Sequence, residues 1–400
     1  MNLRWFLSRT VRHATAMRKH VYHLLCAQRD ILSPQAVDGL NASLDEMAGA
    51  IRSGAKTDEL KAQMEKLEKA AHKWLLPYPS ANIREQIELL LVTVAVAMAI
   101  RTFFIQPFKI PTGSMQPTLF GVTSINLIDQ PNVRIPTGLA SFNEWIHGRS
   151  YVHVTAKHDG QLEAVTEPAK LLIFGLWQRI NIGGHWQTIM FPPDYGSPPQ
   201  GTLQARAGYA DDYGRLQSGI NFRSGEDVVK LQVNAGDYLF VDRLTFNFRK
   251  PQRGEIIVFE TRGMDPNARL DYNIPGDQFY IKRLVGLGGE TLRIGEDHHL
   301  AVDGRRLDAS EPGFQNVYSY DPARGGQNLY FGHLPNPDRS RYFIDGASHT
   351  IATNHFMVLG DNTRSSLDSR FFGDVNCDSI VGKAWFVYWP LTSRFGLGYN

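Results

Sequence analysis

Apolar positions recur at helical spacing in the first fifth of the chain. In residues 43–76 they form two runs with spacings of three, four or seven, first Leu44, Met47 and Ile51 and then Leu60, Met64, Leu67 and Trp74. Ser43, followed three positions later by Glu46, predicts a capping box at a helix start. The Ser53-Gly54 step predicts a break into two helices. An amphipathic helix packed on its neighbour is the favoured interpretation, and a helical hairpin or coiled-coil surface for a partner is the alternative.

A longer apolar stretch follows. Residues 89–100 carry no charge, and the wider stretch 87–105 contains only Glu88 and Arg101. A helix over that stretch is about 28 Å long, close to the thickness of the hydrocarbon core. This predicts a transmembrane helix over 85–106 that Pro107 closes. A buried helix of a globular domain is the alternative.

From about residue 122 onward the helical spacing fades. Short runs rich in Val, Ile, Phe and Tyr alternate with Gly, Pro, Asp and Asn, which is typical of short strands joined by loops. The expected strands are Tyr238–Val241, Glu255–Phe259, Phe279–Val285, Thr291–Ile294, His299–Val302, His355–Leu359 and Ala384–Tyr388. Asp303-Gly304 predicts a hairpin turn. The apolar run Leu171–Trp177 is too short to span a membrane, so a buried strand is expected there, with a membrane-surface patch as the alternative.

The distribution of charge along the chain predicts its orientation across the membrane. The net charge is +2, which gives no overall attraction to nucleic acid. Residues 1–80 hold 12 Lys/Arg against 8 Asp/Glu, and the first 19 residues hold five basic groups and no acid. A basic excess before the span predicts a cytoplasmic N-terminus and an extracytoplasmic remainder. No apolar stretch of 7–15 residues follows the basic start, so a cleavable signal peptide is not expected.

Cysteine and histidine patterns exclude the common metal and redox motifs. Cys26 and Cys377 do not form a Cys-x-x-Cys pair, and no His-Glu-x-x-His is present. The two cysteines lie on opposite sides of the expected span, where they cannot form a disulfide. No metal and no cofactor are predicted.

Three polar segments carry the candidate chemistry. The segment 107–119 places Ser114 after a glycine and between two prolines, which predicts a stiff, exposed turn. Lys282 stands in an apolar strand, where burial would lower its pKa and make it a base for a serine hydroxyl. The segment 358–373 contains several hydroxyls and a possible Asp368–Arg370 ion pair. Taken singly, each segment also fits an interpretation without catalysis: a loop serine, a solvent-facing lysine and a polar loop.

Together and in this order, the segments resemble the type I signal peptidases. Residues 112–119 resemble the family's Ser-Gly-Ser-Met-x-Pro-Thr-Leu, and 253–259 its Arg-Gly-Asp-Ile-Val-Val-Phe. Residues 282–290 resemble Lys-Arg-Val-Gly-Leu-Pro-Gly-Asp, with Gly288 and Glu290 as departures. Residues 360–370 resemble Gly-Asp-Asn-x-x-x-Ser-x-Asp-Ser-Arg. The resemblance covers about 85–120 and 232–391 and leaves an insertion at 122–230.

This resemblance implies a role for each matching residue. Ser114 matches the nucleophile and Lys282 the general base, while Ser366 matches the hydroxyl that orients the lysine. Asp368 and Arg370 match a pair that braces the site. The Thr112 hydroxyl and the Ser114 N–H would form the oxyanion hole, with threonine where the family often has serine.

The family also implies a fold and a function. We expect a mainly β peptidase domain, formed by 107–121 and 231–400, after one transmembrane helix and a helical cytoplasmic region, 1–80. The expected activity is removal of signal peptides from exported preproteins after small residues, of the Ala-x-Ala kind. Expected partners are the preprotein's signal peptide, membrane lipid and the secretion machinery, with no nucleic acid, at a bacterial plasma or inner membrane.

Other functions remain open at this point. A Ser-His-Asp hydrolase could use His349 or His355, although no Gly-x-Ser-x-Gly surrounds Ser114. Self-cleaving repressor-type proteases share the serine–lysine chemistry. Mitochondrial inner-membrane and conjugation-pilus peptidases are closer relatives. A membrane-anchored scaffold without activity is the non-enzymatic alternative, and retention of both Ser114 and Lys282 argues against it.

Overall fold

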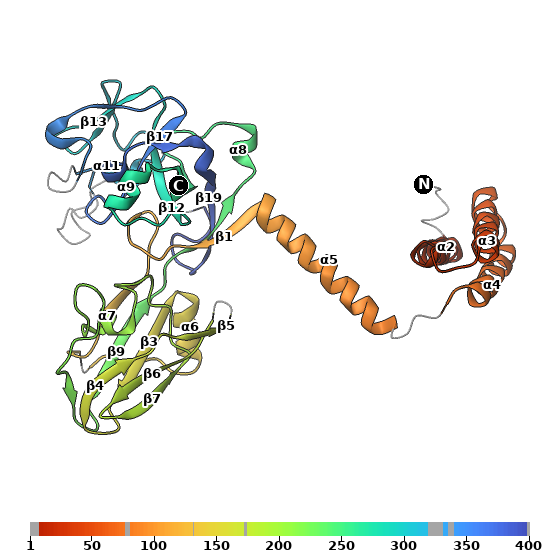
Figure 1. Ribbon diagram of the computed structural model, residues 1–400, viewed down its shortest axis with the longest axis horizontal. Helices are drawn as coiled ribbons and strands as arrows, with labels where there is room; N and C mark the ends of the chain where they lie inside the picture. Colours follow the sequence, from red (N-terminus) through yellow and green to blue (C-terminus); the bar gives the residue numbers. More distant parts are fainter. Residues whose placement is uncertain are drawn as a thin grey trace. The chain divides into compact units, whose positions relative to one another are not determined.

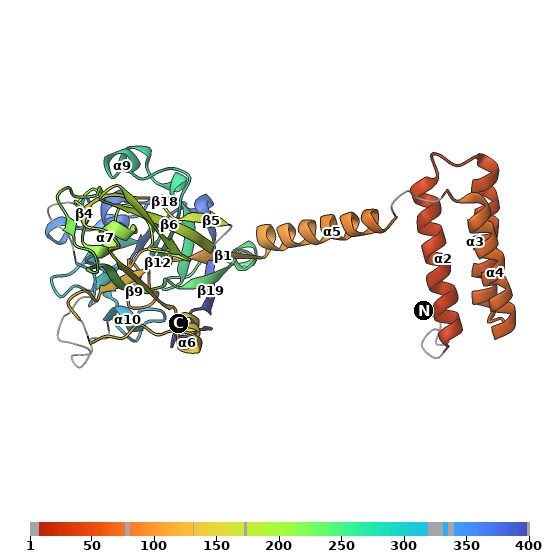
Figure 2. The same ribbon diagram turned by 90° about the horizontal axis from the view of Figure 1, so that it is seen from below.

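The structure is a computed structural model that describes residues 8–76, 81–130, 132–171, 174–318, 331–334 and 340–397. The chain divides into two compact units, Met1–Val94 and Ala95–Asn400. The first unit contains helices α2 Arg9–Gln28, α3 Pro34–Ser53 and α4 Thr57–Trp74. Figure 2 shows these three helices packed side by side, and their shared core includes Val21, Leu25, Leu40, Met47 and Leu67.

The boundaries of these helices partly agree with the sequence pattern. Gly54, in the left-handed conformation at φ 72°, ends α3, so the break expected at Ser53-Gly54 is confirmed. The capping box at Ser43 is wrong. α3 begins nine residues earlier, where Ser33 caps Ala36 N–H, and the Ser43 hydroxyl donates to the Gly39 carbonyl inside the helix. Helix α2 was not predicted, because basic residues interrupt its apolar face.

The apolar stretch forms one helix, α5 Ala81–Phe103. Its residues Ile83–Phe103 are long and apolar enough to cross a membrane, and none of this segment is buried. It is the one such helix among the described residues. The expectation that Pro107 closes the helix is wrong, since α5 ends at Phe103 and Pro107 lies in strand β1, Ile105–Lys109.

A seven-stranded sheet organises the second unit, with strand order β1-β10-β19-β11-β12-β17-β18 and antiparallel pairing throughout. After β1 its strands are β10 Tyr238–Asp242, β11 Ile256–Glu260, β12 Phe279–Leu287, β17 His355–Leu359, β18 Val375–Asn376 and β19 Ile380–Trp389. The sheet curls (Figure 1), so that Phe108 of β1 and Phe279 of β12, four strands apart, meet with ring centroids 5.3 Å apart. The expected mainly β fold is confirmed.

A smaller sheet and short helices complete this part. The sheet has the order β15-β14-β13-β16, and its strands are β13 Thr291–Ile294, β14 Leu300–Val302, β15 Arg305–Arg306 and β16 His349–Thr350. Asp303 and Gly304 form the predicted turn with φ of 50° and 81°. The short helices are α8 Thr245–Phe248, η1 Thr261–Gly263, α9 Pro266–Asp271, α10 Gln315–Tyr318, η3 Ile344–Gly346, α11 Ser369–Phe372 and η4 Cys377–Ser379.

The insertion expected at 122–230 folds as a β-sandwich with two sheets. One sheet has the order β2-β9-β3 and the other β5-β6-β4-β8, with β7 paired to β6. Their strands are β2 Thr123–Asn126, β3 Arg149–Thr155, β4 Gly160–Val165, β5 Ala169–Leu171, β6 Phe174–Ile182, β7 His185–Met190, β8 Asn221–Phe222 and β9 Asp227–Asn234; helices α6 Leu139–Ile146 and α7 Leu203–Ala207 accompany them.

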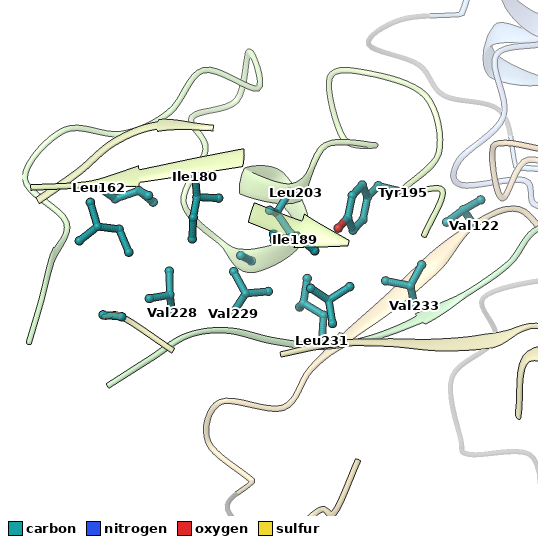
Figure 3. Packing of buried hydrophobic residues seen from close by; sticks show 14 residues of the cluster. Val122, Leu162, Ile180, Ile189, Tyr195, Leu203, Val228, Val229, Leu231 and Val233 are labelled. Carbon is teal, nitrogen blue, oxygen red and sulfur yellow. The ribbon is translucent and has the colours of Figure 1, made fainter. Parts of the chain in front are cut away.

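Figure 3 shows buried apolar side chains from both sheets meeting between them, among them Ile180, Ile189, Val229 and Leu231. The run Leu171–Trp177 was expected as a buried strand. Leu171 ends β5 and Phe174 begins β6, while 172–173 lie outside the described residues. Leu171 and Trp177 are 62% and 44% exposed, so the run is not a buried strand where it is described.

Candidate active site

The structure brings Ser114 and Lys282 together. Ser114 lies in the turn that follows β1, and Lys282 lies on β12, 168 positions later. The Lys282 ammonium donates a 2.8 Å hydrogen bond to the Ser114 hydroxyl oxygen, and both side chains are buried. A solvent-facing lysine is therefore excluded, and the pair has the geometry of a nucleophile and its base.

The surroundings of Lys282 favour its neutral form. Burial lowers the pKa of Lys282 from its ordinary value of 10.5 to about 8, although the Asp368 and Asp361 carboxylates raise it. Arg370 lowers it further. A lysine with a pKa near 8 can accept a proton from a serine hydroxyl close to neutral pH.

Close backbone contacts hold the Ser114 turn in place. A side chain at Gly121 would lie 2.1 Å from the Thr112 carbonyl carbon, and one at Gly236 would lie 1.9 Å from the Ile110 oxygen. From the other side, Asn362 donates through its N–H to the Ser114 carbonyl at 3.1 Å and through its amide to the Gly113 carbonyl at 2.9 Å. The turn is thus clamped between two glycines and the loop after β17.

The predicted oxyanion groups lie on the open side of this turn. Thr112 is exposed. Among the described residues, the Ser114 N–H donates no hydrogen bond. Both donors are therefore available to an oxygen of a bound substrate.

Ser366 lies beside the Ser114 carbonyl. A side chain at Gly360 would come within 2.1 Å of the Ser366 hydroxyl oxygen and 2.5 Å of the Ser114 carbonyl oxygen, so these two groups flank Gly360 closely. Ser366 is buried. Within the part of the chain that the structure describes, no hydrogen bond joins its hydroxyl to Lys282.

Asp368 and Arg370 form a buried pair with two hydrogen bonds, each 2.9 Å. Although burial raises the pKa of Asp368, the Arg370 guanidinium brings it below its ordinary value. The carboxylate also accepts the Gly360 N–H at 2.9 Å, and Arg370 donates to the Thr363 hydroxyl at 2.9 Å. The pair thus fixes the loop that carries Ser366.

A second buried pair was not predicted from the sequence. Arg283, the residue after Lys282, donates to both oxygens of Asp361 at 2.8 and 2.5 Å, and Asp361 also accepts the Thr118 hydroxyl. All three side chains are buried. Since Thr118, Arg283 and Asp361 come from the three polar segments, this cluster joins them at the site. The sequence feature that could have indicated this pair is Arg283 itself, a second charged residue next to Lys282 in an apolar strand.

The histidine alternative finds no support in this geometry. His349 lies 2.6 Å from Asp374 and contacts the ring of Tyr342. His355 contacts the Thr353 carbonyl. Within the described ranges, Ser114 pairs with Lys282, and no group of three or more His, Cys, Asp or Glu side chains could hold a metal ion.

Fold and site together define a class of protein: an antiparallel β-domain that carries a buried serine–lysine pair, preceded by an apolar helix. The family described as "Signal peptidase, peptidase S26" matches residues 83–127 and 226–389. These segments make up more than half of the chain and include both residues of the pair. The chain belongs to this family, as its motifs indicated, and the match omits most of the insertion.

Individual relatives agree with this assignment. Signal peptidase I of Leptolyngbya laminosa is 31% identical and matches 42% of this chain and 66% of its own length. Signal peptidase I of Pseudomonas aeruginosa is 30% identical, over 40% of this chain and 62% of its own length. Signal peptidase I of Bacillus caldolyticus is 33% identical, over 40% of this chain and 72% of its own length.

The chain spans about three fifths to two thirds of the length of the first curated relatives it matches. A crystal structure of a signal peptidase I from Enterococcus faecalis V583 is 27% identical, over 34% of this chain and 97% of that chain, with a TM-score of 0.23.

Proposed function

We propose that this protein is a membrane-bound serine endopeptidase that removes N-terminal signal peptides from exported preproteins. Ser114 is the nucleophile and Lys282 the general base. The single observation that carries this proposal is the 2.8 Å hydrogen bond between these two buried groups. Membership of the signal peptidase family supports the substrate class.

The reaction follows from the positions of these groups. Neutral Lys282 takes the Ser114 proton as the serine oxygen attacks the scissile carbonyl carbon, and the resulting ammonium gives that proton to the leaving amine. Water, deprotonated by the same lysine, then releases the acyl group. No metal or cofactor takes part in this scheme.

The Ser114 N–H and the Thr112 hydroxyl stabilise the negative charge on the carbonyl oxygen in the transition state. Preorganised donors of this kind each contribute about 3–4 kcal/mol. The family motif assigns Ser366 to orient the lysine. The Asp368–Arg370 pair supports this role because it keeps the Ser366 loop in place.

Strand edges beside the pair suit an extended substrate. Among the described residues, β1 pairs only with β10 and the first residues of β12 pair only with β11, which leaves one edge of each strand unpaired there. A peptide between these edges can add as a strand and place its scissile bond at Ser114. The apolar cluster of Ile110, Met115 and Ile281 next to the serine suits small, uncharged residues before the cut, as in Ala-x-Ala sites.

The helix α5 anchors the protein in a bacterial plasma or inner membrane. The basic excess of residues 1–80 favours a cytoplasmic N-terminal bundle, with the transmembrane segment at 85–106 and the peptidase domain outside. The preprotein's signal peptide, membrane lipid and the secretion machinery are then the expected partners, and nucleic acid is not one.

The direct test is cleavage of a purified preprotein by the full chain reconstituted in lipid vesicles, with sequencing of the new N-terminus. A new terminus after a small residue at the signal peptide boundary is the expected result. An uncut preprotein contradicts the proposed activity. Reporters fused at each end test the topology, and finding both ends on one side of the membrane contradicts the single span.

A further inference from the structure

The insertion and the peptidase sheet enclose a cavity that the proposed mechanism does not use. Its volume is about 960 Å³, within the range of sites that bury a sizeable organic ligand. The floor comes from the outer face of the peptidase sheet, through Lys109, Tyr238, Tyr388 and Trp389. Its walls come from the sandwich, including Leu176, Phe191, Tyr195 and Leu203.

Direct contacts join the two parts around this cavity. Lys109 forms an ion pair with Asp194, and Trp145 packs on Trp389 with ring centroids 5.7 Å apart. Within the insertion, Arg206 donates to the carbonyls of Val122 and Tyr195 at distances of 2.8 to 3.0 Å and so fixes the wall that contains Tyr195. The cavity therefore lies at an ordered interface between the insertion and the peptidase sheet.

Its lining is apolar and aromatic, yet it contains buried hydrogen-bonding atoms without a partner among the described residues. These atoms are the Tyr195 hydroxyl and the Gln178 side-chain oxygen, on residues that are 3% and 1% exposed. The indole N–H of Trp389 is a third. These three residues belong to the lining, but their unpartnered atoms are enclosed by protein, so the surface that a ligand meets is mainly apolar.

The charged residues of the lining indicate which kind of ligand the cavity can hold. The charged residues of the lining are Lys109, Lys170, Glu167 and Asp194, so that positive and negative groups balance. At the lining, Leu171 and Phe191 are 62% and 72% exposed. A neutral, apolar peptide segment fits these surroundings better than a charged one.

The position of Lys109 relates the cavity to the active site. Lys109 is the last residue of β1 and precedes Ser114, in the turn that follows, by five residues. Side chains of a strand alternate between its two faces, and Lys109 lies on the face opposite to Phe108, which packs on the core beside Ser114. A substrate strand that runs parallel to β1 therefore directs alternate side chains toward the cavity, beginning several residues before the cut.

We propose that this cavity binds the apolar part of the signal peptide upstream of the cleavage site, and so makes the insertion a specificity element. This rests on the proposed function. The apolar character of the cavity selects the signal side, because a signal peptide carries its apolar stretch before the cut and the mature chain has no such requirement.

The experiment uses the full chain in lipid vesicles and two peptides that share one Ala-x-Ala site. The long peptide carries leucines from roughly the fourth to the tenth residue before the cut, and the short one begins roughly three residues before it. Leu176→Trp and Ala235→Trp fill the cavity, and Leu270→Trp, on the exposed helix α9, is the matched control.

The filled variants are expected to raise KM for the long peptide about tenfold, equivalent to about 1.4 kcal/mol of binding free energy, with kcat unchanged. Their kcat/KM for the short peptide and both parameters of Leu270→Trp should equal wild type. Equal KM values for the long peptide in all variants would overturn the proposal.

A photo-crosslinking measurement keeps the proposal testable if a filled variant fails to fold. A benzoylphenylalanine placed at the exposed position Phe191 should crosslink the long peptide at its leucines. Crosslinks to phospholipid alone would show a lipid site and overturn the proposal. If wild type cuts neither peptide, the proposed peptidase activity fails, whereas the crosslink still reports on the cavity.

Discussion

The Arg283 guanidinium and the Asp361 carboxylate form an ion pair with two hydrogen bonds, of 2.8 and 2.5 Å, in the buried layer beside Lys282. The pair connects β12 to the loop after β17, and Asp361 also accepts the hydroxyl of Thr118 from the segment that carries Ser114. Lys282 is thus held in register with Ser114 by its own chain neighbour.

Asp361→Asn tests this connection, because it leaves Arg283 buried without its counter-charge. Loss of one partner of a buried pair costs about 3–5 kcal/mol, and we expect a loss of unfolding free energy of that size, measured by denaturant titration of the full chain in detergent. The double variant Arg283→Met/Asp361→Leu removes both charges and should recover much of the lost unfolding free energy. An unchanged unfolding midpoint for Asp361→Asn would refute the bracing role.

Thr112 tests the oxyanion arrangement. Thr112→Val keeps the shape of the side chain and removes its donor, so kcat should fall by about 10²–10³-fold with little change in KM. Thr112→Ser restores the hydroxyl and serves as the control, with activity close to wild type. A valine variant as active as wild type would mean that Thr112 takes no part in oxyanion binding.

The pH profile reports on Lys282. The base must be neutral to accept the serine proton, so kcat/KM should rise with pH and reach half of its plateau near pH 8, where the pKa of Lys282 lies. About one tenth of the lysine is neutral at pH 7. Asp368 raises the pKa of Lys282, so Asp368→Asn should move the midpoint to lower pH. A flat profile between pH 6 and 9, measured with a peptide substrate, would be incompatible with a lysine base.

Much of the peptidase core could be predicted from the sequence. β13 and β17 have the predicted limits, and β10, β11, β12, β14 and β19 overlap their predicted strands. Alternating apolar residues and turn residues are local signals, and these strands carry both. The motif segments around Ser114 and Lys282 could be matched because each is a short run of adjacent residues.

Other features depend on distant contacts that no local pattern records. Arg283 and Asp361 lie 78 positions apart, and the sequence contains nothing that pairs them. The insertion has strands as short as two to four residues and departs from regular alternation, so its sandwich was not predicted. Ser43 misled the helix prediction, because a capping pattern inside a helix looks the same as one at its start.

The central claim is that Ser114 and Lys282 act as nucleophile and base, and one measurement tests it most directly. Single-turnover cleavage of a preprotein is compared for wild type, Ser114→Ala and Lys282→Ala, with Ser310→Ala and Lys250→Ala, both exposed, as matched controls. The rate should fall by at least about 10³-fold in each of the first two variants and stay at the wild-type level in the controls. Cleavage at the wild-type rate by Ser114→Ala or by Lys282→Ala would contradict the serine–lysine mechanism.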